Sequence, residues 1–179
     1  KWNKESLQSF LIEITAEIFR TLDTETPDKT DYLIDFILDK AGSKGTGKWT
    51  SQDAMNVGVP IPTIDAAVAA RTLSAYKDHR VQAATLYQKQ TESFPLNKQK
   101  FIPLLEDALC FGFIISYAQG LSLLAGASKE YKFEIPLPDV VSIWKGGCII
   151  RSSLLYQFDK AFATNTSQPN VLLDGSVAE

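Results

Sequence analysis

The residues best suited to chemistry lie in one glycine-rich segment, Gly42-Ser43-Lys44-Gly45-Thr46-Gly47-Lys48-Trp49. Its glycines let the backbone approach a ligand closely, while Lys44, Thr46 and Lys48 add positive charge and hydrogen-bond donors. This combination predicts a binding site for an anion, and a phosphate fits it best. The segment is not a nucleotide-binding P-loop, because Trp49 stands where that motif has serine or threonine and no strand pattern precedes it.

Arg71 is the second candidate, because its helical neighbours three, four and seven residues earlier are all apolar: Val68, Ala67 and Ile64. A guanidinium in such surroundings stays charged, so it needs an anionic partner or a route to water. One interpretation is an internal ion pair with a carboxylate. The other is a bound anionic ligand, which the glycine-rich segment favours. For Lys44 and Lys48 the alternative is that they are solvated loop lysines and that the glycines serve only a turn.

Other kinds of site have little support in the sequence. The single histidine, His79, lies in the polar run 77–80, which is typical of an exposed helix face, so it is a poor candidate for catalysis. No Gly-x-Ser-x-Gly motif or Cys-His pair indicates acyl transfer, and one histidine with two dispersed cysteines forms no metal-ligand cluster. No Gly-x-Gly-x-x-Gly follows a strand, so a dinucleotide fold is not expected in this chain.

The composition is that of one globular domain: 179 residues, 45% hydrophobic and 22% charged. A net charge of -3 and a pI near 5.3 argue against a nucleic-acid partner. The most apolar stretch, residues 108–115, is too short to span a bilayer, so no membrane partner is expected. Cys110 and Cys148 look like small buried hydrophobes in a reducing compartment, although a disulfide is left open. We therefore expect a soluble, cytoplasmic protein.

Helical periodicity sets the expected architecture in the first part of the chain. A long first helix follows from a stripe of apolar residues at three- and four-residue steps: Leu7, Phe10, Leu11, Ile14, Ile18 and Leu22. Pro27 and Asp28 break it, and a second helix, capped by Thr30 or Asp31, is expected to end at Gly42. Residues 50–53 resemble a capping box, which predicts a short helix from there to Gly58 and places the donors of the glycine-rich segment beside a helix N-terminus.

The second half of the chain also has helical patterns. Residues 59–62 are expected to be extended because of two prolines, after which Thr63 caps a helix to about Tyr76 that is apolar on nearly every face and so surrounded by other helices. A long helix is expected from Lys98 to Leu124, and a last one from Asp139 to Leu154. No stretch alternates with a period of two, so the fold class is all-α.

Five segments, in order along the chain, carry a family resemblance: 38–50, 58–60, 69–71, 115–120 and 143–151. With them the sequence resembles the helical C-terminal domain of the 6-phosphogluconate dehydrogenase family. The resemblance implies a multi-helix bundle and an incomplete substrate-binding and dimerisation domain over residues 1–179, with the N-terminal Rossmann domain absent from this chain.

The resemblance also implies roles and an activity. Lys44 matches the family lysine that contacts the phosphate of 6-phosphogluconate. Thr46 matches a threonine beside that lysine, and Arg71 matches a substrate-binding arginine. The family enzyme is a homodimer of the pentose phosphate pathway that oxidises and decarboxylates 6-phosphogluconate with NADP, giving ribulose 5-phosphate and CO2. Its catalytic lysine and glutamate would precede Lys1, NADP would be bound mainly by the absent domain, and an arginine and a histidine from the partner's tail would lie beyond Glu179. The chain alone is then expected to be inactive.

Two alternatives belong to other classes. One is a non-catalytic helical dimerisation module in which the glycine-rich segment is structural. The other is a related 3-hydroxyacid dehydrogenase that acts on an unphosphorylated acid. Arg71 and the lysines of the glycine-rich segment argue against the second alternative, because such a substrate would leave their positive charge unpaired.

Overall fold

The computed structural model describes residues 1–25, 30–87, 97–165, 168 and 170–178. Across these residues it contains eight α-helices and three short 3-10 helices, and no β-strand. Two isolated β-bridges, Ser9 with Ser152 and Leu22 with Tyr32, are the extent of the strand-like pairing in this part of the chain. The predicted all-α fold class is confirmed.

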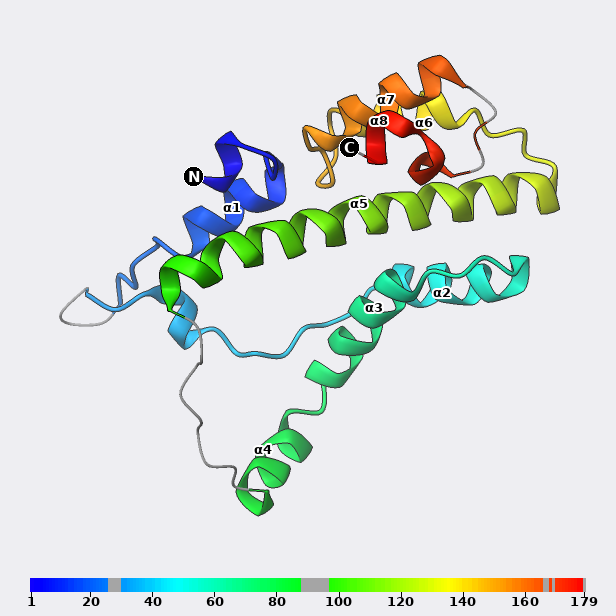
Figure 1. Ribbon diagram of the computed structural model, residues 1–179. Coiled ribbons are helices and arrows are strands. Elements are labelled where there is room, and N and C mark those ends of the chain that lie inside the picture. The colour runs from blue at the N-terminus through cyan, green and yellow to red at the C-terminus, as the bar shows by residue number, and fades with distance from the viewer. Residues whose placement is uncertain (26–29, 88–96, 166–167, 169, 179) are drawn as a thin grey trace.

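One long helix, α5 (Lys98–Tyr131), runs through the centre of the molecule (Figure 1). Asn97 caps it by accepting the backbone N–H of Lys100 at 2.9 Å. On one side of α5 lie α1 (Phe10–Ile18), α6 (Leu137–Trp144), α7 (Leu154–Thr164) and α8 (Gly175–Ala178). On the other side lie α2 (Thr46–Val57) and α3 (Pro62–Ser74). The helix α5 therefore separates two layers.

The larger core lies between α5, α6, α7 and the 3-10 helix Val171–Leu173. Its buried side chains are Ala118, Leu121, Val141, Leu154, Leu155, Phe158, Phe162 and Val171. A smaller cluster of Ala54, Ile61 and Leu123 attaches α2 and the start of α3 to the opposite side of α5. Gly126 permits this second contact, because a Cβ there would lie 2.6 Å from Val59 Cγ2.

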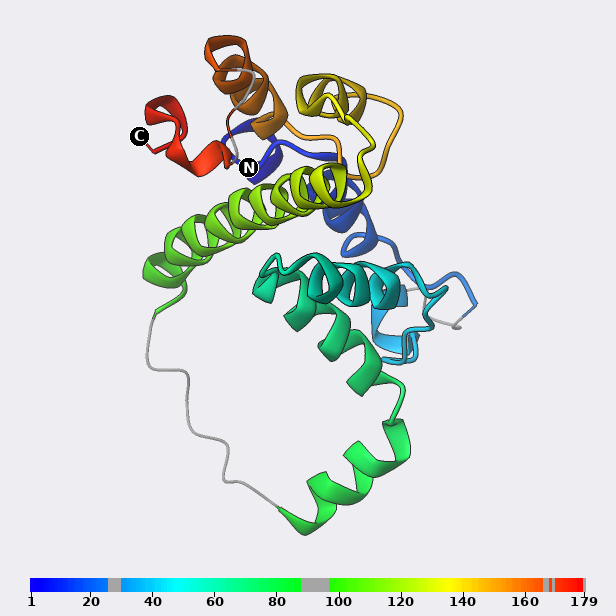
Figure 2. The same ribbon diagram turned by 90° about the vertical axis from the view of Figure 1, so that its right-hand side faces the viewer.

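The helix α4 (Lys77–Leu86) follows α3 and projects away from both layers (Figure 2). Its residue His79 stacks on Tyr76, with ring centroids 5.7 Å apart. The predicted exposed helix face at residues 77–80 is thus partly correct, although Lys77 and Arg80 have specific partners that are described below.

Two predicted helices near the N-terminus are wrong in extent. The first shortens to the 3-10 helix Trp2–Lys4 and the nine residues of α1, which the Ser9 hydroxyl caps. The second is only a 3-10 helix, Leu33–Phe36, and Ile37 and Leu38 are 59% and 62% exposed. Short helices need tertiary packing to offset nucleation, and these side chains find little of it in this chain. The predicted break at Pro27 and Asp28 lies outside the described residues.

Glycines shift the other helix boundaries. The helix expected from residue 50 begins at Thr46, but it ends at Gly58 as predicted, with Gly58 at φ 68°. The helix expected from Asp139 to Leu154 is wrong in extent: α6 ends at Trp144, α7 begins only at Leu154, and Gly147, at φ 71°, lies in the non-helical segment between them. The prediction that α3 is surrounded by other helices is also wrong, since none of its side chains is buried.

The helix α5 extends to Tyr131, beyond the predicted end at Leu124. By length and composition it could cross a membrane, a possibility that residues 108–115 alone had excluded. A core helix of a globular protein meets the same criterion; α5 has helices packed on two sides, although only 17% of its most apolar 18-residue stretch is buried. Cys110 and Cys148 are free and partly buried, and burial raises the pKa of the Cys110 thiol.

Candidate functional site

The glycine-rich segment and α3 together enclose a cavity of about 580 Å³. Three cationic residues line it, namely Lys44, Lys48 and Arg71, and the hydroxyl residues Ser43, Thr46 and Thr72 lie among them. No acidic residue is part of the lining. The structure therefore brings together Lys44, Thr46 and Arg71, the three residues that the sequence selected, in a cavity suited to an anion.

The glycine-rich segment is itself the start of a helix. Gly45 is the N-terminal cap of α2 at φ 98°, a conformation that favours glycine, and a Cβ there would lie 3.3 Å from the Trp49 ring. The first intrahelical bond of α2 runs from Trp49 N to Gly45 O at 2.9 Å. The backbone N–H groups of residues 46–48 therefore lie in the first turn, at the positive end of the helix dipole. The donors of the glycine-rich segment were expected to lie beside a helix N-terminus, and in the structure these N–H groups are themselves part of the first turn of that helix.

A close approach of α2 to α3 brings Arg71 to this helix end. A Cβ on Gly47 would lie 3.0 Å from Val68 Cγ2, so glycine allows the two helices to touch. Ser51 Oγ also donates to Asp65 Oδ1 at 2.7 Å across the same interface. Because Arg71 follows Val68 by three residues, it lies on the face of α3 that meets α2.

Arg71 has no carboxylate partner within ion-pair distance in the described part of the chain, where the salt bridges involve other residues. Its side chain is exposed, not enclosed by an apolar helix bundle as its neighbours suggested. The internal ion pair that the sequence left as an alternative is therefore not observed in these residues. Arg71 instead has a route to water through the cavity.

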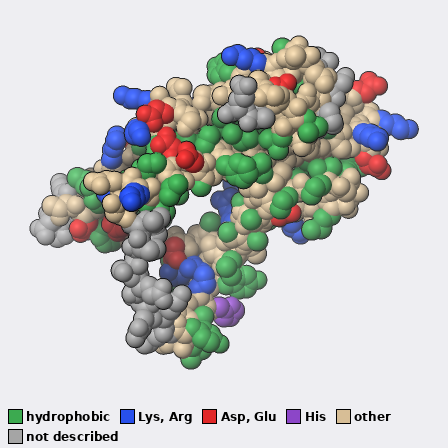
Figure 3. Space-filling view, in the orientation of Figure 1, with side chains coloured by type: hydrophobic (Ala, Val, Ile, Leu, Met, Phe, Trp, Pro, Cys, Tyr) green, Lys and Arg blue, Asp and Glu red, His purple; other side chains and the backbone are tan. Residues whose placement is uncertain are grey.

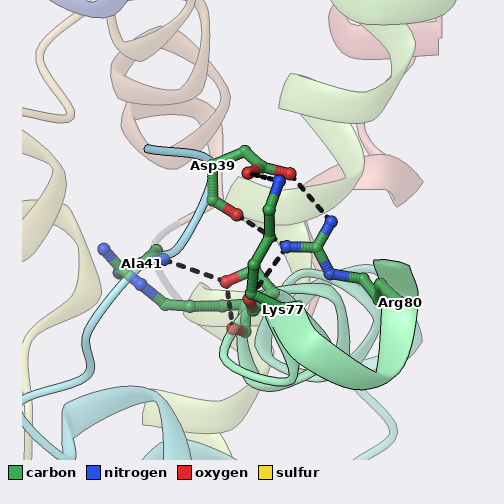
Figure 4. A network of polar contacts seen from close by, with 6 residues as sticks. Asp39, Ala41, Lys77 and Arg80 are labelled. Carbon is green, nitrogen blue, oxygen red and sulfur yellow. Dashed lines mark hydrogen bonds and ion pairs between the residues drawn. The ribbon is translucent and has the colours of Figure 1, made fainter. Parts of the chain in front are cut away.

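Sequence reasoning missed a charged cluster at the edge of this site. Asp39, which precedes the glycine-rich segment, accepts hydrogen bonds from Lys77 Nζ and, at 2.8 Å, from Arg80 Nη1 (Figure 4). These two donors hold the pKa of the Asp39 carboxyl at about 2, below its usual 3.8. The sequence feature that could have indicated this cluster is the pair of cations Lys77 and Arg80, three residues apart on one helix. Their partner, Asp39, is distant in the sequence and could not be identified from it.

Metal and cofactor ligands are not concentrated here. Among the described residues, no group of three or more His, Cys, Asp and Glu side chains could hold a metal ion. The described residues also form no strand that could begin a nucleotide-binding βαβ unit. The groups that line the cavity, which are lysine, arginine and hydroxyl side chains, are ones that can bind an anion.

Comparison with known proteins identifies the family. The model of the 6-phosphogluconate dehydrogenase C-terminal domain matches residues 1–179. A decarboxylating 6-phosphogluconate dehydrogenase of Synechocystis is 47% identical over 174 residues, which are 97% of this chain and 36% of that protein. The NADP(+)-dependent enzyme of Bacillus subtilis is 44% identical over 175 residues, 97% of this chain and 37% of its own length.

A solved structure agrees with the sequence relatives. The 6-phosphogluconate dehydrogenase of Plasmodium falciparum, studied in its apo form and with NADP+ or 6-phosphogluconate, superposes with a TM-score of 0.90 at 39% identity. The match covers 99% of this chain and 38% of that one, so this chain spans a little over a third of the length of these relatives. The resemblance seen in the sequence is confirmed, and the chain belongs to the 6-phosphogluconate dehydrogenase family, whose C-terminal domain it matches.

Proposed function

We propose that this chain provides the phosphate-binding part of the substrate site in an NADP-dependent, decarboxylating 6-phosphogluconate dehydrogenase. The observation that carries the proposal is the cavity lined by Lys44, Lys48 and Arg71 without any acidic residue. A phosphate dianion would neutralise the repulsion among these cations. The substrate named for the relatives, 6-phosphogluconate, carries such a group.

In this proposal Lys44 and Arg71 bind the phosphate oxygens by charge-assisted hydrogen bonds, each contributing about 1.5–3 kcal/mol. Thr46 donates its hydroxyl, and the first-turn N–H groups of α2 point toward the same oxygens. Anchoring the phosphate fixes the far end of the sugar acid and so orients the carbons that react. NADP, when bound, supplies the oxidation that precedes loss of CO2 and formation of ribulose 5-phosphate.

The division of labour in the enzyme follows from this role. We assign residues 1–179 to an incomplete helical C-terminal domain that binds substrate and forms dimer contacts. The catalytic lysine and glutamate and most of the NADP site would come from other parts of the enzyme. The free cysteines Cys110 and Cys148 support a reducing compartment, for which we propose the cytoplasm.

Steady-state kinetics of the complete enzyme test the site. Lys44→Ala and Arg71→Ala are each expected to raise the KM for 6-phosphogluconate by about tenfold or more, because each removes a charged contact to the phosphate. The KM for NADP should not change. Lys129→Ala, an exposed lysine on α5 outside the cavity lining, is the matched control. Normal kinetics after both substitutions would refute the assignment.

Substrate comparison separates this proposal from a dehydrogenase of an unphosphorylated acid. Gluconate should be a poor substrate of the complete enzyme, because it leaves the cations of the cavity unpaired. Equal turnover of gluconate and 6-phosphogluconate would instead favour the related 3-hydroxyacid dehydrogenase.

A separate observation supports a second candidate function, that of a homodimerisation module. The chain exposes 13,113 Å², whereas a compact monomer of 19.8 kDa is expected to expose about 8,600 Å². Many large apolar side chains are exposed, and hydrophobic side chains gather on the surface seen in Figure 3. Light scattering would detect the dimer, and calorimetric titration with 6-phosphogluconate would show whether it also binds substrate. A dimer that does not bind 6-phosphogluconate would favour the module alone.

A further inference from the structure

The two cations of the proposed phosphate site come from separate segments that repel each other. Lys44 lies in the loop before α2, and Arg71 lies in the last turn of α3. Both side chains are exposed, and without a bound anion their like charges oppose close approach. The α2–α3 contact at Gly47 and the Ser51–Asp65 hydrogen bond oppose this repulsion, and the loop before Lys44 has a further attachment to α3.

A cluster of four residues, Asp39, Ser74, Lys77 and Arg80, joins these two segments. We call it the Asp39 clamp. Besides its bond to the Asp39 carboxylate, Arg80 donates from Nη2 to Asp39 O at 2.9 Å and to Ser74 O at 3.1 Å. The Arg80 side chain thus bridges the start of the loop and the end of α3 directly (Figure 4).

Ser74 makes the second connection. Its hydroxyl accepts the backbone N–H of Ala41 at 3.0 Å and donates to the carbonyl oxygen of Arg71 at 2.7 Å. The backbone of the loop, three residues before Lys44, is therefore tied through one hydroxyl to the backbone of Arg71.

The geometry points to positioning and not to stability as the main effect of the clamp. The Asp39 and Lys77 side chains are 55% and 36% exposed, and exposed ion pairs contribute little to the free energy of unfolding. Arg80 is different, because its planar fork reaches a carboxylate and two carbonyl oxygens at once, and a lysine has no such fork. All three of these bonds come from its terminal nitrogens, Nη1 and Nη2.

We propose that Arg80 and Ser74 are positioning residues for substrate binding, which set the distance between Lys44 and Arg71 although neither lines the cavity. This inference rests on the proposed function, because it assumes that Lys44 and Arg71 bind the phosphate. It goes further by assigning a role to residues on α4 and at the end of α3 that act through the two cations.

The test is the kinetics of Arg80→Lys in the complete enzyme. This variant keeps the positive charge but cannot make the three bonds together, so it separates position from long-range attraction of an anion. We expect the KM for 6-phosphogluconate to rise by about tenfold, with kcat and the KM for NADP nearly unchanged. Ser74→Ala should raise the same KM by a smaller factor. Asp78→Asn, in the first turn of α4 but outside the clamp, is the matched control.

The outcomes distinguish the two levels of the proposal. If Lys44→Ala raises the KM while Arg80→Lys and Ser74→Ala leave it within about twofold, the clamp has no positioning role and the phosphate site stands. If Lys44→Ala also leaves the KM unchanged, the proposed function fails and the clamp inference with it. Thermal unfolding of each variant checks that it is folded. If Arg80→Lys does not fold, the KM of Ser74→Ala decides whether the clamp has a positioning role.

Discussion

At the scale of single residues, the role of a charge depends on its neighbours. Arg71 and Arg80 lie nine positions apart on consecutive helices, yet only Arg80 has a carboxylate partner in the described residues. Arg71 faces a cavity that two lysines share. Arg71 is therefore available to bind a ligand, whereas the guanidinium of Arg80 is already bound to other groups of the protein.

The Asp39 carboxyl provides a prediction about pH. Because its pKa in the folded protein is about 2, below the usual 3.8, its contribution to stability is present above pH about 4 and is lost as the pH falls through about 2. Carbon-detected NMR of the side-chain carboxyl should show this low midpoint, and Arg80→Met should move it upward. A wild-type midpoint near 3.8 would contradict the two-donor arrangement.

Tyr117 provides a second prediction. Its hydroxyl donates to the carbonyl oxygen of Ile150 and lies 2.9 Å from Ser152 Oγ, so it ties α5 to the segment before α7. Tyr117→Phe keeps the edge-to-face packing on Phe158, but it leaves the Ile150 carbonyl without its donor and removes the oxygen that is hydrogen-bonded to Ser152 Oγ. Urea denaturation should show a loss of about 1–3 kcal/mol.

The control for Tyr117 is Tyr156→Phe. Tyr156 is 58% exposed, and its ring, above which Lys145 Nζ lies at 5.5 Å, is retained in the variant. Its free energy of unfolding should change by less than about 0.5 kcal/mol. Equal losses of stability in both variants would mean that the hydrogen bonds of the Tyr117 hydroxyl contribute no specific stabilisation.

At the scale of elements, α5 organises the molecule because it is packed on two sides. The α6–α7 side contains the larger core, and the α2–α3 side is attached through a small cluster and a close glycine contact. Gln119 of α5 strengthens this second side, because its Oε1 accepts the N–H groups of Thr63 and Ile64 in the first turn of α3. The cavity thus depends on how α3 sits on α5.

Gly126→Ala tests that packing. The added Cβ would meet Val59 Cγ2 at 2.6 Å, so α5 and the segment between α2 and α3 must separate, at a cost of about 1–3 kcal/mol. Gly112→Ala, also in α5 but with nothing beyond the neighbouring backbone of α5 within 4 Å of the added Cβ, should instead stabilise by about 0.5–1 kcal/mol. Opposite signs in urea denaturation are expected, and a stabilised Gly126→Ala variant would show that the contact is not close.

At the scale of the whole molecule, the exposed area is too large for a compact monomer. The excess over the expected area is of the order of 4,500 Å² for this one chain, which is more than one partner's share of a large obligate interface, since such interfaces bury about 2,000–5,000 Å² over both partners together. Exposed apolar side chains occur on α3, α4 and α5, including Leu73, Leu86 and Phe111. The molecule therefore has surface available for the proposed dimer contacts.

Thermal unfolding of the complete protein should depend on its concentration. If a second copy covers this surface, mass action couples folding to association, and Tm rises as the protein concentration is increased. Differential scanning calorimetry over a hundredfold range of concentration, about 1 to 100 µM, would measure the shift. A Tm that stays constant across this range, together with a monomeric mass, would refute the dimer.

The sequence by itself determined the helical fold class, the long central helix and the end of α2 at Gly58, and it selected Lys44, Thr46 and Arg71 as candidates for anion binding. These features depend on local periodicity, on glycine and on the chemistry of single side chains, all of which can be read along the chain. The family resemblance extended this to their expected roles, which the kinetics above will test.

Only the tertiary structure decided the rest. Residues 33–38, apolar except for Asp35, have the pattern of a helix, but most of their large side chains are exposed among the described residues and find too little packing to offset its nucleation, so only one short turn forms. The convergence of Lys44 and Arg71 requires that α2 touch α3 at Gly47, and the clamp requires Asp39 to meet Arg80 from a distant part of the chain. Such contacts depend on the geometry of packed helices, which the local sequence does not specify.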